Sequence, residues 1–203
     1  MRYLKEYKEM NRLIKVGITG GIGSGKSYIA DIFHTKYNIP IYNSDNRSKY
    51  LMVNDPSVGN KIIKYFGEDS YIDNQINKEK FNKLLFENKD NLALMNSIII
   101  PAMELDFNNF CKNIKSPYVL KESAILLETD SYKSLGKIIC VVADMELRTK
   151  RVTTRDNMNQ DLFFKKVANQ SSDEEKIAKS DYIIYNNGGN LEGEIEKIIY
   201  NKK

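Results

Sequence analysis

The amino-acid sequence predicts an α/β fold of three layers, in which helices cover both faces of a five-stranded parallel sheet. Short apolar runs typical of buried strands alternate along the chain with longer segments whose apolar residues recur at helical spacing. Because parallel strands need long crossover connections, this alternation favours a parallel sheet. A glycine-rich segment directly after the first apolar run is typical of a turn from a strand into a helix.

The length of 203 residues and the 41% of hydrophobic residues allow one sizeable core, so we expect a single domain with an insertion, at residues 10–203. The strand-like runs are Leu13 to Thr19, Ile39 to Tyr42, Tyr118 to Leu120, Ile138 to Val142 and Tyr182 to Tyr185. We place the core of the domain at about residues 13–54, 116–144 and 181–203. Residues 1–9 are expected to be an N-terminal extension, and no role is assigned to them.

The segment after the first strand has the pattern of a phosphate-binding loop. Residues 20 to 27 read Gly-Gly-Ile-Gly-Ser-Gly-Lys-Ser, which matches G-x-x-x-x-G-K-[ST] at every fixed position. The glycines allow the backbone to turn its amide groups inward, Lys26 reaches the β- and γ-phosphates, and Ser27 offers its hydroxyl to Mg²⁺. The helix that follows directs its positive end at the same anion. The residues expected to bind a nucleotide here are Gly21, Ile22, Gly23, Ser24, Gly25, Lys26, Ser27 and Tyr28.

Asp45 lies just beyond the second strand, at the carboxyl end of the sheet, where open α/β folds bind their ligands. Phosphoryl transfer depends mainly on alignment and charge neutralisation, so a polar group is needed beside the acceptor hydroxyl. We expect the Asp45 carboxylate to hydrogen-bond that hydroxyl or to hold a water molecule on Mg²⁺. The alternative is that Asp45 only caps the helix that begins at Asn46.

A long segment between the second and third strands, at about residues 55–115, has helical spacing and little strand character. Asp55 followed by Pro56 is a typical helix start, and Gly67 is placed to end that helix. Farther along, Pro101 is expected to bend or restart the chain. We expect this insertion to be the lobe that binds the acceptor.

The ends of the third and fifth strands carry further candidate residues. Glu122 ends the third strand, where phosphate-loop proteins often have an acid that organises Mg²⁺, and Glu128 follows a short apolar run later. Either acid could instead be an ordinary surface residue. After the fifth strand, Asn187 and Gly188 lie in a turn whose amides could contact an adenine ring, although Asn-Gly turns are usually only turns.

A second helical block, at about residues 145–180, is rich in arginine and lysine, and Asp144 is expected to cap its start. Charge of this density is most often a solvated helix face. A lid that closes over a triphosphate would also need such cations, because charge develops on the γ-phosphoryl oxygens during transfer.

The amino-acid composition limits which ligands and which cellular location we expect. The net charge of +4 comes from lysines and arginines spread along the chain among acidic residues, which suits a small polyanion, and the basic and aromatic interleaving of nucleic-acid binding is not evident. Cys111 and Cys140 lie far apart without a metal-binding pattern, so we expect reduced, buried thiols. No apolar run approaches the roughly 20 residues of a membrane helix, and the N-terminus is too charged for a signal peptide. We therefore expect a cytoplasmic protein, a monomer or weak homo-oligomer, that acts on a small molecule.

From about residue 13 to 200, the chain resembles the dephospho-coenzyme A kinase family. Thr19 to Ser27 repeats that family's opening string, Thr-Gly-Gly-Ile-Gly-Ser-Gly-Lys-Ser, which is more specific than the general loop pattern. Asn43-Ser44-Asp45 corresponds to the family's Asp-Ala-Asp and keeps the second acid. The segment from Arg148 to Asp156 is similar to the family's lid pattern, and Gln170 is similar to the glutamine that begins the next lid segment.

The resemblance implies a P-loop kinase that uses ATP and Mg²⁺. It would transfer the γ-phosphoryl group to the ribose 3′-hydroxyl of dephospho-CoA, the last step of coenzyme A synthesis. It implies catalytic roles for Lys26, Asp45 and Arg155, nucleotide contacts from Arg151, and a place near the adenine for Asn187 and Gly188. The chain departs from the family at Ile100-Pro101, where the family usually has His-Pro, away from the phosphate chemistry.

Other functions fit the loop and the lid cations less closely. A nucleoside monophosphate kinase or small-metabolite kinase of the same architecture is an alternative, because these features do not identify the acceptor. A GTPase-like switch would need D-x-x-G to sense the γ-phosphate and N-K-x-D to bind guanine, and the sequence contains neither pattern.

Overall fold

The computed structural model of the protein describes residues 13–200, apart from the side chains of residues 86 and 87. The extension expected at residues 1–9 lies outside the described residues. The chain divides into two compact units: residues 13–42 with 113–200 form the sheet unit, and Asn43–Lys112 forms the helical unit.

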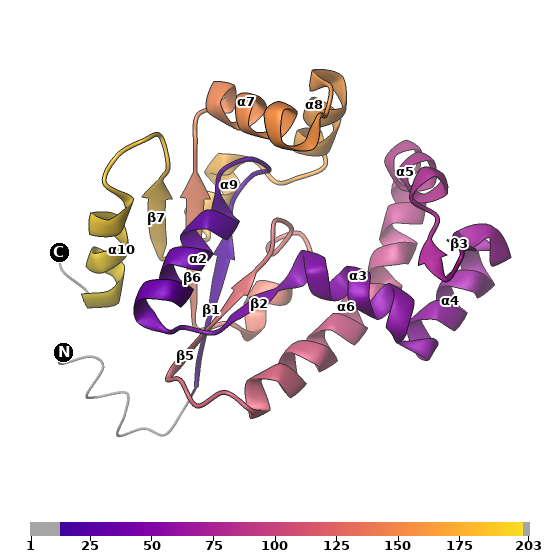
Figure 1. Cartoon of the computed structure of the whole chain (residues 1–203), viewed down its shortest axis with the longest axis horizontal. Helices are drawn as coiled ribbons and strands as arrows, with labels where there is room; N and C mark the ends of the chain where they lie inside the picture. Colours follow the sequence, from indigo (N-terminus) through magenta and orange to yellow (C-terminus); the bar gives the residue numbers. More distant parts are fainter. Residues whose placement is uncertain (1–12, 201–203) are drawn as a thin grey trace. The chain divides into compact units, whose positions relative to one another are not determined.

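The sheet unit is built on five strands in the order β2-β5-β1-β6-β7 (Figure 1). The strands are β1 (Ile14–Thr19), β2 (Ile41–Asn43), β5 (Tyr118–Glu122), β6 (Lys137–Val142) and β7 (Tyr182–Tyr185). Strand β1 pairs in parallel with both β5 and β6, and β6 pairs in parallel with β7. The predicted five-stranded parallel sheet is confirmed, and the five predicted runs agree with the strands to within two residues at each end.

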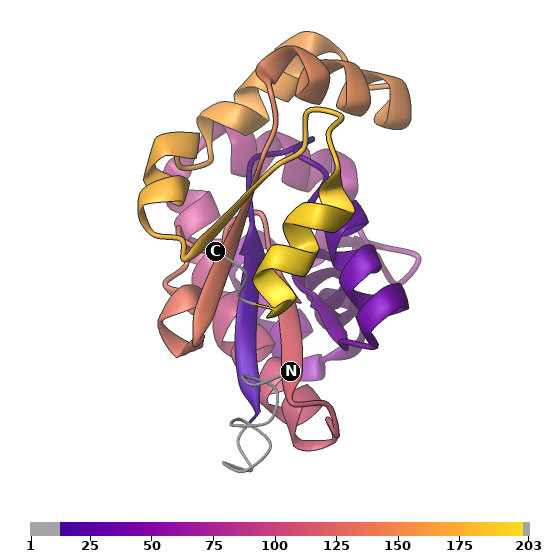
Figure 2. The ribbon, with the colours of Figure 1, turned by 90° about the vertical axis from the view of Figure 1, so that its left-hand side faces the viewer.

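Helices cover both faces of this sheet (Figure 2). Helices α2 (Lys26–Tyr37) and α10 (Leu191–Tyr200) share one core with the strands, in which Phe33 and Ile195 pack with Val141 of β6. The alternate residue of β6, Cys140, is buried on the opposite face, where helix α9 (Asp173–Ala178) contacts the strand. This alternation along one strand is what a sheet buried on both faces requires.

Both cysteines are free thiols. Cys140 is fully buried as predicted, and burial raises the pKa of its thiol to about 11. Cys111 is only half-buried, because it lies near the end of a helix.

The predicted helical block at residues 145–180 forms three helices: α7 (Met145–Asp156), α8 (Gln160–Ala168) and α9. Asp144 occupies the position before α7, but its side chain makes no capping hydrogen bond to the helix. Instead, its carboxylate accepts a hydrogen bond from Asn187, so the predicted cap is wrong. A partner after strand β7 competes with the helix end for this carboxylate.

The helical unit has its own core of Leu51, Val58, Ile62, Phe81, Met95, Ile98 and Ile99. Its helices are α3 (Ser44–Asn54), α4 (Pro56–Phe66), α5 (Lys78–Glu87) and α6 (Lys89–Lys112). A 3₁₀ turn (Glu68–Ser70) and a hairpin of β3 (Tyr71–Ile72) and β4 (Gln75–Ile76) connect α4 to α5. Arg47 joins α3 to α6 through hydrogen bonds of 2.8 and 2.6 Å to the two carboxylate oxygens of Asp106.

Pro101 lies inside α6, which continues without a break to Lys112, so the predicted restart of the chain is wrong. A proline within a helix costs about 3 kcal/mol, because it lacks an N–H and its ring crowds the preceding turn. Ile98 and Ile99, in the turn before it, are buried in the core of the helical unit. Burial of such side chains contributes about 1.5–3 kcal/mol each, enough to offset the loss.

A membrane-crossing helix, long and apolar enough to span a bilayer, does not occur among residues 13–200.

The start of α4 follows the prediction. The Asp55 carboxylate accepts hydrogen bonds from the backbone N–H groups of Ser57 and Val58, at 2.8 and 3.3 Å, and Gly67 ends the helix with a φ of 90°. We expect Asp55→Ala to lower the free energy of unfolding by about 1 kcal/mol, because these N–H groups lose their acceptor. Urea unfolding followed by circular dichroism measures the change.

Asp55→Asn is the matched control, since its side-chain oxygen can still accept both hydrogen bonds. It should unfold close to the wild type, and equal midpoints for the alanine variant and the wild type would contradict the capping role.

Candidate functional site

The loop between β1 and α2 is folded tightly against the ends of β6 and β7. Gly20, Gly23 and Gly25 have φ values of 146°, 79° and 92°, which side-chain-bearing residues rarely adopt. A Cβ atom at Gly20 would lie 2.1 Å from the carbonyl oxygen of Val141, and one at Gly25 would lie 2.1 Å from Nδ2 of Asn186. The loop can take this shape only with glycine at these positions.

Helix α2 begins directly at this loop, and Gly25 precedes it without a side-chain cap. The N–H groups of a first helical turn have no partner within the helix and carry the positive end of its dipole. An anion bound in the loop would therefore meet these donors, as the sequence predicts.

Lys26 and Ser27 both have defined partners beside the loop. The buried Lys26 ammonium donates a hydrogen bond to the carbonyl oxygen of Gly21 at 3.1 Å, so the side chain reaches back across the loop. The Ser27 hydroxyl donates to Oε1 of Glu122 at 2.6 Å. Glu122, at the end of β5, is 7% exposed. A hydroxyl and a carboxylate thus lie together next to the lysine.

Glu128, the other candidate acid, has different neighbours. Its Oε1 accepts hydrogen bonds from the backbone N–H of Ser171 at 2.7 Å and from the ammonium of Lys176 at 3.2 Å. Lys176 is fully buried in α9 and also donates to the carbonyl of Ser171. Glu128 therefore fixes the start of α9 by pairing a buried cation, whereas Glu122 contacts the residue expected to bind the metal.

Arg151 of α7, predicted to bind the nucleotide, contacts the loop backbone. Its guanidinium donates hydrogen bonds to the carbonyls of Gly23 at 3.4 Å and Asn186 at 2.9 Å. The side chain of Asn186 in turn donates to the carbonyl of Ser24 at 2.8 Å. The structure thus brings α7 and the end of β7 onto the phosphate-binding loop.

Asn187 and Gly188 follow β7. Asn187 and Asp144 form a reciprocal pair, in which the Asp144 N–H donates to Oδ1 of Asn187 at 2.9 Å and Nδ2 of Asn187 donates back to the carboxylate at 2.8 Å. Gly188 has a φ of 98°, and the space that a side chain there would enter is open.

Tyr28, Arg155 and Asp45, like Asn187 and Gly188, are placed without a described contact to the loop. Tyr28 is 61% exposed on α2. Arg155, at the end of α7, donates two hydrogen bonds to Asp156 at 2.7 and 2.8 Å, and this pairing lowers the pKa of Asp156. Asp45 lies in the first turn of α3, two residues beyond the end of β2. The cap of α3 is Asn43, whose side chain accepts from the N–H of Asn46 at 2.8 Å, so the alternative that Asp45 is the cap is wrong.

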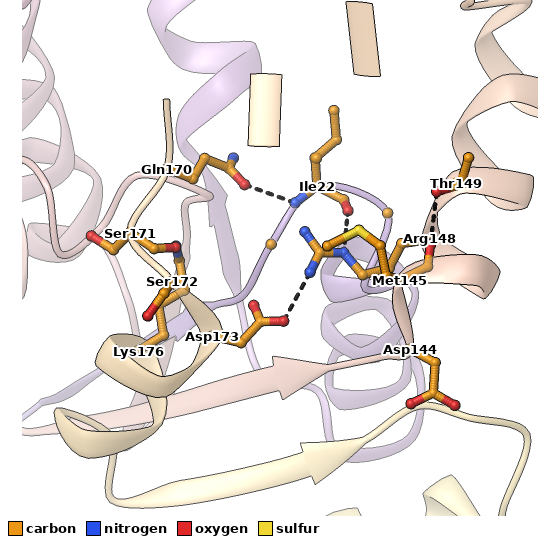
Figure 3. A network of polar contacts seen from close by, with 12 residues as sticks. Ile22, Asp144, Met145, Arg148, Thr149, Gln170, Ser171, Ser172, Asp173 and Lys176 are labelled. Atoms are coloured by element: carbon orange, nitrogen blue, oxygen red, sulfur yellow. Dashed lines mark hydrogen bonds and ion pairs between the residues drawn. The ribbon is translucent and has the colours of Figure 1, made fainter. Parts of the chain in front are cut away.

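The loop is also held by two side chains that the site predicted from the sequence did not include, those of Arg148 and Gln170. Arg148 donates a hydrogen bond from Nε to the carbonyl of Ile22 at 2.8 Å, and the N–H of Ile22 donates to Oε1 of Gln170 at 2.9 Å (Figure 3). Arg148 is 2% exposed. The available signal was its spacing, because Arg148 lies four residues before the buried Val152 and so shares its helix face.

The arrangement can bind a phosphate chain and provide oxygen ligands for a hard cation. Loop amides and Lys26 are donors for phosphate oxygens, and the oxygens of Ser27 and Glu122 are the ligand type that Mg²⁺ prefers. Within the described part of the chain, no cluster of three or more His, Cys, Asp or Glu side chains could hold a metal by itself. Mg²⁺ in kinase sites commonly takes only one or two protein ligands, with substrate phosphates and water completing its shell.

A family model and curated relatives identify the family of this chain. A family model described as dephospho-CoA kinase matches residues 14–192. A dephospho-CoA kinase of Bacteroides fragilis is 32% identical over 176 residues, which cover 86% of this chain and 85% of the relative. One from Fusobacterium nucleatum is 34% identical over 188 residues, covering 90% and 94%. The crystal structure of TT1252 from Thermus thermophilus is similar in fold, with a TM-score of 0.83, 22% identity and coverage of 95% of this chain and all of that one.

The tight contact at Gly25 generates a test of the loop. We expect Gly25→Ala to weaken ATP binding by about tenfold or more, because its Cβ would collide with Asn186 and strain a backbone of positive φ. Isothermal titration calorimetry with ATP and Mg²⁺ measures the affinity. Gly136→Ala is the matched control, since its added Cβ would make only ordinary contacts, 3.5 Å from Ile14 and 3.6 Å from Lys15. Equal affinities of the two variants would show that the loop does not bind the nucleotide in this shape.

Proposed function

The chain belongs to the dephospho-CoA kinase family, and we propose that its phosphate-binding loop, Lys26 and Asp45 carry out that family's reaction. The protein is a kinase that catalyses the last step of coenzyme A synthesis. In this step the ATP γ-phosphoryl group is transferred to the ribose 3′-hydroxyl of dephospho-CoA. The observation that carries the proposed mechanism is the glycine-dependent loop, with Lys26 folded across it and Ser27 against Glu122.

Lys26 is proposed to neutralise charge on the β- and γ-phosphates. Its ammonium already lies over the loop, bonded to the carbonyl of Gly21, so little reorganisation is needed when a phosphate oxygen replaces that partner. The loop amides and the first turn of α2 would bind the remaining oxygens. Together these groups hold the terminal phosphorus in place, which is most of what a loose phosphoryl-transfer transition state requires.

Ser27 and Glu122 are proposed as the residues that hold Mg²⁺. The Ser27 hydroxyl gives its hydrogen to Glu122, which leaves the oxygen lone pairs of Ser27 available to a cation. The ion, when bound, would supply positive charge that neutralises the phosphate chain. Glu122 thereby keeps the serine hydroxyl in the orientation that a metal ligand needs.

Asp45 is proposed to accept a hydrogen bond from the attacking 3′-hydroxyl and to take its proton as the new P–O bond forms and the bond from the γ-phosphorus to the leaving ADP oxygen breaks. Its position supports this role, since it follows β2 at the carboxyl end of the sheet and is not the cap of α3. The helical insertion, proposed at about residues 55–115, would bind the rest of the acceptor.

Residues 145–180 are proposed as a lid, with Arg155 closing onto the phosphates. The exposure of Arg155, at 68% of its side chain, supports a movable arginine. Arg148 and Arg151 tie the first turns of α7 to the loop, and Lys176 with Glu128 ties α9. These anchors would confine closure to the end of α7 and to α8. Asn187 and Gly188 are proposed to lie beside the adenine, where the space next to Gly188 is open.

We also propose a cytoplasmic location and a monomer or weak homo-oligomer. Two free thiols suit a reducing compartment.

The acceptor is tested by measuring ADP release with ATP and Mg²⁺ against dephospho-CoA, AMP, CMP and shikimate. We expect dephospho-CoA to be the preferred acceptor by about 100-fold or more in kcat/KM, because remote binding energy from the rest of the molecule aligns its hydroxyl. Preference for AMP, CMP or shikimate would instead identify a kinase of another acceptor on the same fold.

Asp45→Asn tests the proposed base. It should lower kcat by about 100-fold or more, because asparagine cannot take the proton, and leave the KM for ATP nearly unchanged. Asp55→Asn, which removes a carboxylate but keeps the α4 cap, is the control and should retain the wild-type kcat. Turnover near the wild-type value in Asp45→Asn would rule out its position beside the acceptor hydroxyl.

A further inference from the structure

The peptide group of Ile22 in the phosphate-binding loop is held on both sides by the charged helical block. Nε of Arg148 donates to its carbonyl oxygen at 2.8 Å, and the Ile22 N–H donates to Oε1 of Gln170 at 2.9 Å. In Figure 3 these two side chains approach Ile22 from α7 and from the segment before α9. The contacts span 126 and 148 residues of sequence.

Arg148 is itself held in place. Its NH1 group donates to Oδ2 of Asp173 at 2.8 Å, and the arginine side chain is only 3% exposed. A buried guanidinium must be paired, and its planar, rigid arrangement of donors lets one group serve Ile22 and Asp173 together. The charge of Arg148 is thus neutralised by α9 and directed at a loop carbonyl.

Arg148 also occupies the space beside the loop. A Cβ atom at Gly21 would lie 2.0 Å from Nη2 of Arg148, and the other near atoms belong to the same guanidinium. The φ of Gly21 is outside the positive range, unlike those of Gly20, Gly23 and Gly25. Arg148, and not a requirement of the backbone, therefore excludes a side chain at Gly21.

We propose that Arg148 is a positioning residue, which sets the shape of the phosphate-binding loop through the Ile22 peptide and is aligned for this by Asp173. The inference rests on nucleotide binding by the loop, as proposed above. With the peptide fixed, the following loop amides are arranged before the nucleotide arrives, so less ordering has to accompany binding. Loss of Arg148 should therefore raise the KM for ATP and leave the KM for dephospho-CoA within about twofold.

The competing explanation is that Arg148 contacts a phosphate directly. Asp173→Asn distinguishes the two explanations, because they predict opposite changes in ATP affinity. If the guanidinium bound phosphate directly, removal of the neutralising carboxylate would strengthen ATP binding. If Arg148 positions the loop, the same change weakens the hydrogen bond that aligns the guanidinium, because a neutral amide is a weaker acceptor than a carboxylate, and ATP binding weakens with it. We expect Asp173→Asn to weaken ATP binding by about threefold or more.

The experiment measures ATP affinity by calorimetry and steady-state kinetics for the wild type, Arg148→Met, Asp173→Asn and Arg47→Met. Arg148→Met keeps the apolar stem and should weaken ATP binding by about tenfold or more, with partial rescue by Arg148→Lys. Arg47→Met is the matched control, because it removes a similar arginine–aspartate pair from the helical unit, and its ATP affinity should stay at the wild-type value. Affinities of Arg148→Met equal to the wild type, or tighter binding by Asp173→Asn, would overturn the inference.

Gly21→Ala gives a second test that leaves the arginine in the chain. The added methyl group should displace the guanidinium and weaken ATP binding, whereas in the Arg148→Met background it should cause little further loss. Independent, additive losses of ATP affinity in the double variant would overturn the inference, and wild-type ATP affinity of Gly21→Ala alone would overturn it even if Arg148→Met folds poorly. A wild type that binds ATP while the variants match it contradicts the positioning role alone; a wild type that does not bind ATP contradicts the proposed function as well.

Discussion

The close approach of the phosphate-binding loop to neighbouring strand ends is the constraint on which the rest of the site depends. At Gly20 and Gly25 the loop backbone lies so near Val141 and Asn186 that even a methyl group would collide. A glycine loop held in this shape can present backbone amides to an anion. The sheet order, with β6 and β7 beside β1, supplies the surfaces against which the loop folds.

The basic side chains of residues 145–180 contact the protein's own backbone and acids, in addition to the contact with a ligand that is proposed for them. Arg148 and Arg151 donate to loop carbonyls, and the buried Lys176 pairs with Glu128 to hold α9. Neither a purely solvated face nor a freely moving lid describes this block. The cations at the two ends of the block make structural contacts that position it. The exposed Arg155, which lies between them, is the residue proposed to take part in closure.

Two glutamates close together in the sequence have different roles because they have different neighbours in the fold. Glu122 and Glu128 are both carboxylates on the same segment, yet one shares a hydrogen bond with Ser27 and the other neutralises a buried lysine. A buried cation without a partner is strongly destabilising, so Glu128 is committed to Lys176. Glu122 remains as the acid that orients the hydroxyl of Ser27, the proposed ligand of Mg²⁺.

The sequence by itself determined the features that depend on local geometry: the five strands, the glycine loop before α2, and the start of α4 at Asp55. These follow from backbone sterics and short-range hydrogen bonds, which neighbouring residues control. The hairpin at residues 71–76 was missed because strands of two residues carry no pattern, and α6 runs through Pro101 because core packing outweighs the local cost. Only the tertiary structure decided that Arg148 meets Ile22 and that Glu122 meets Ser27, since such pairs join residues about a hundred positions apart and depend on how the helices pack.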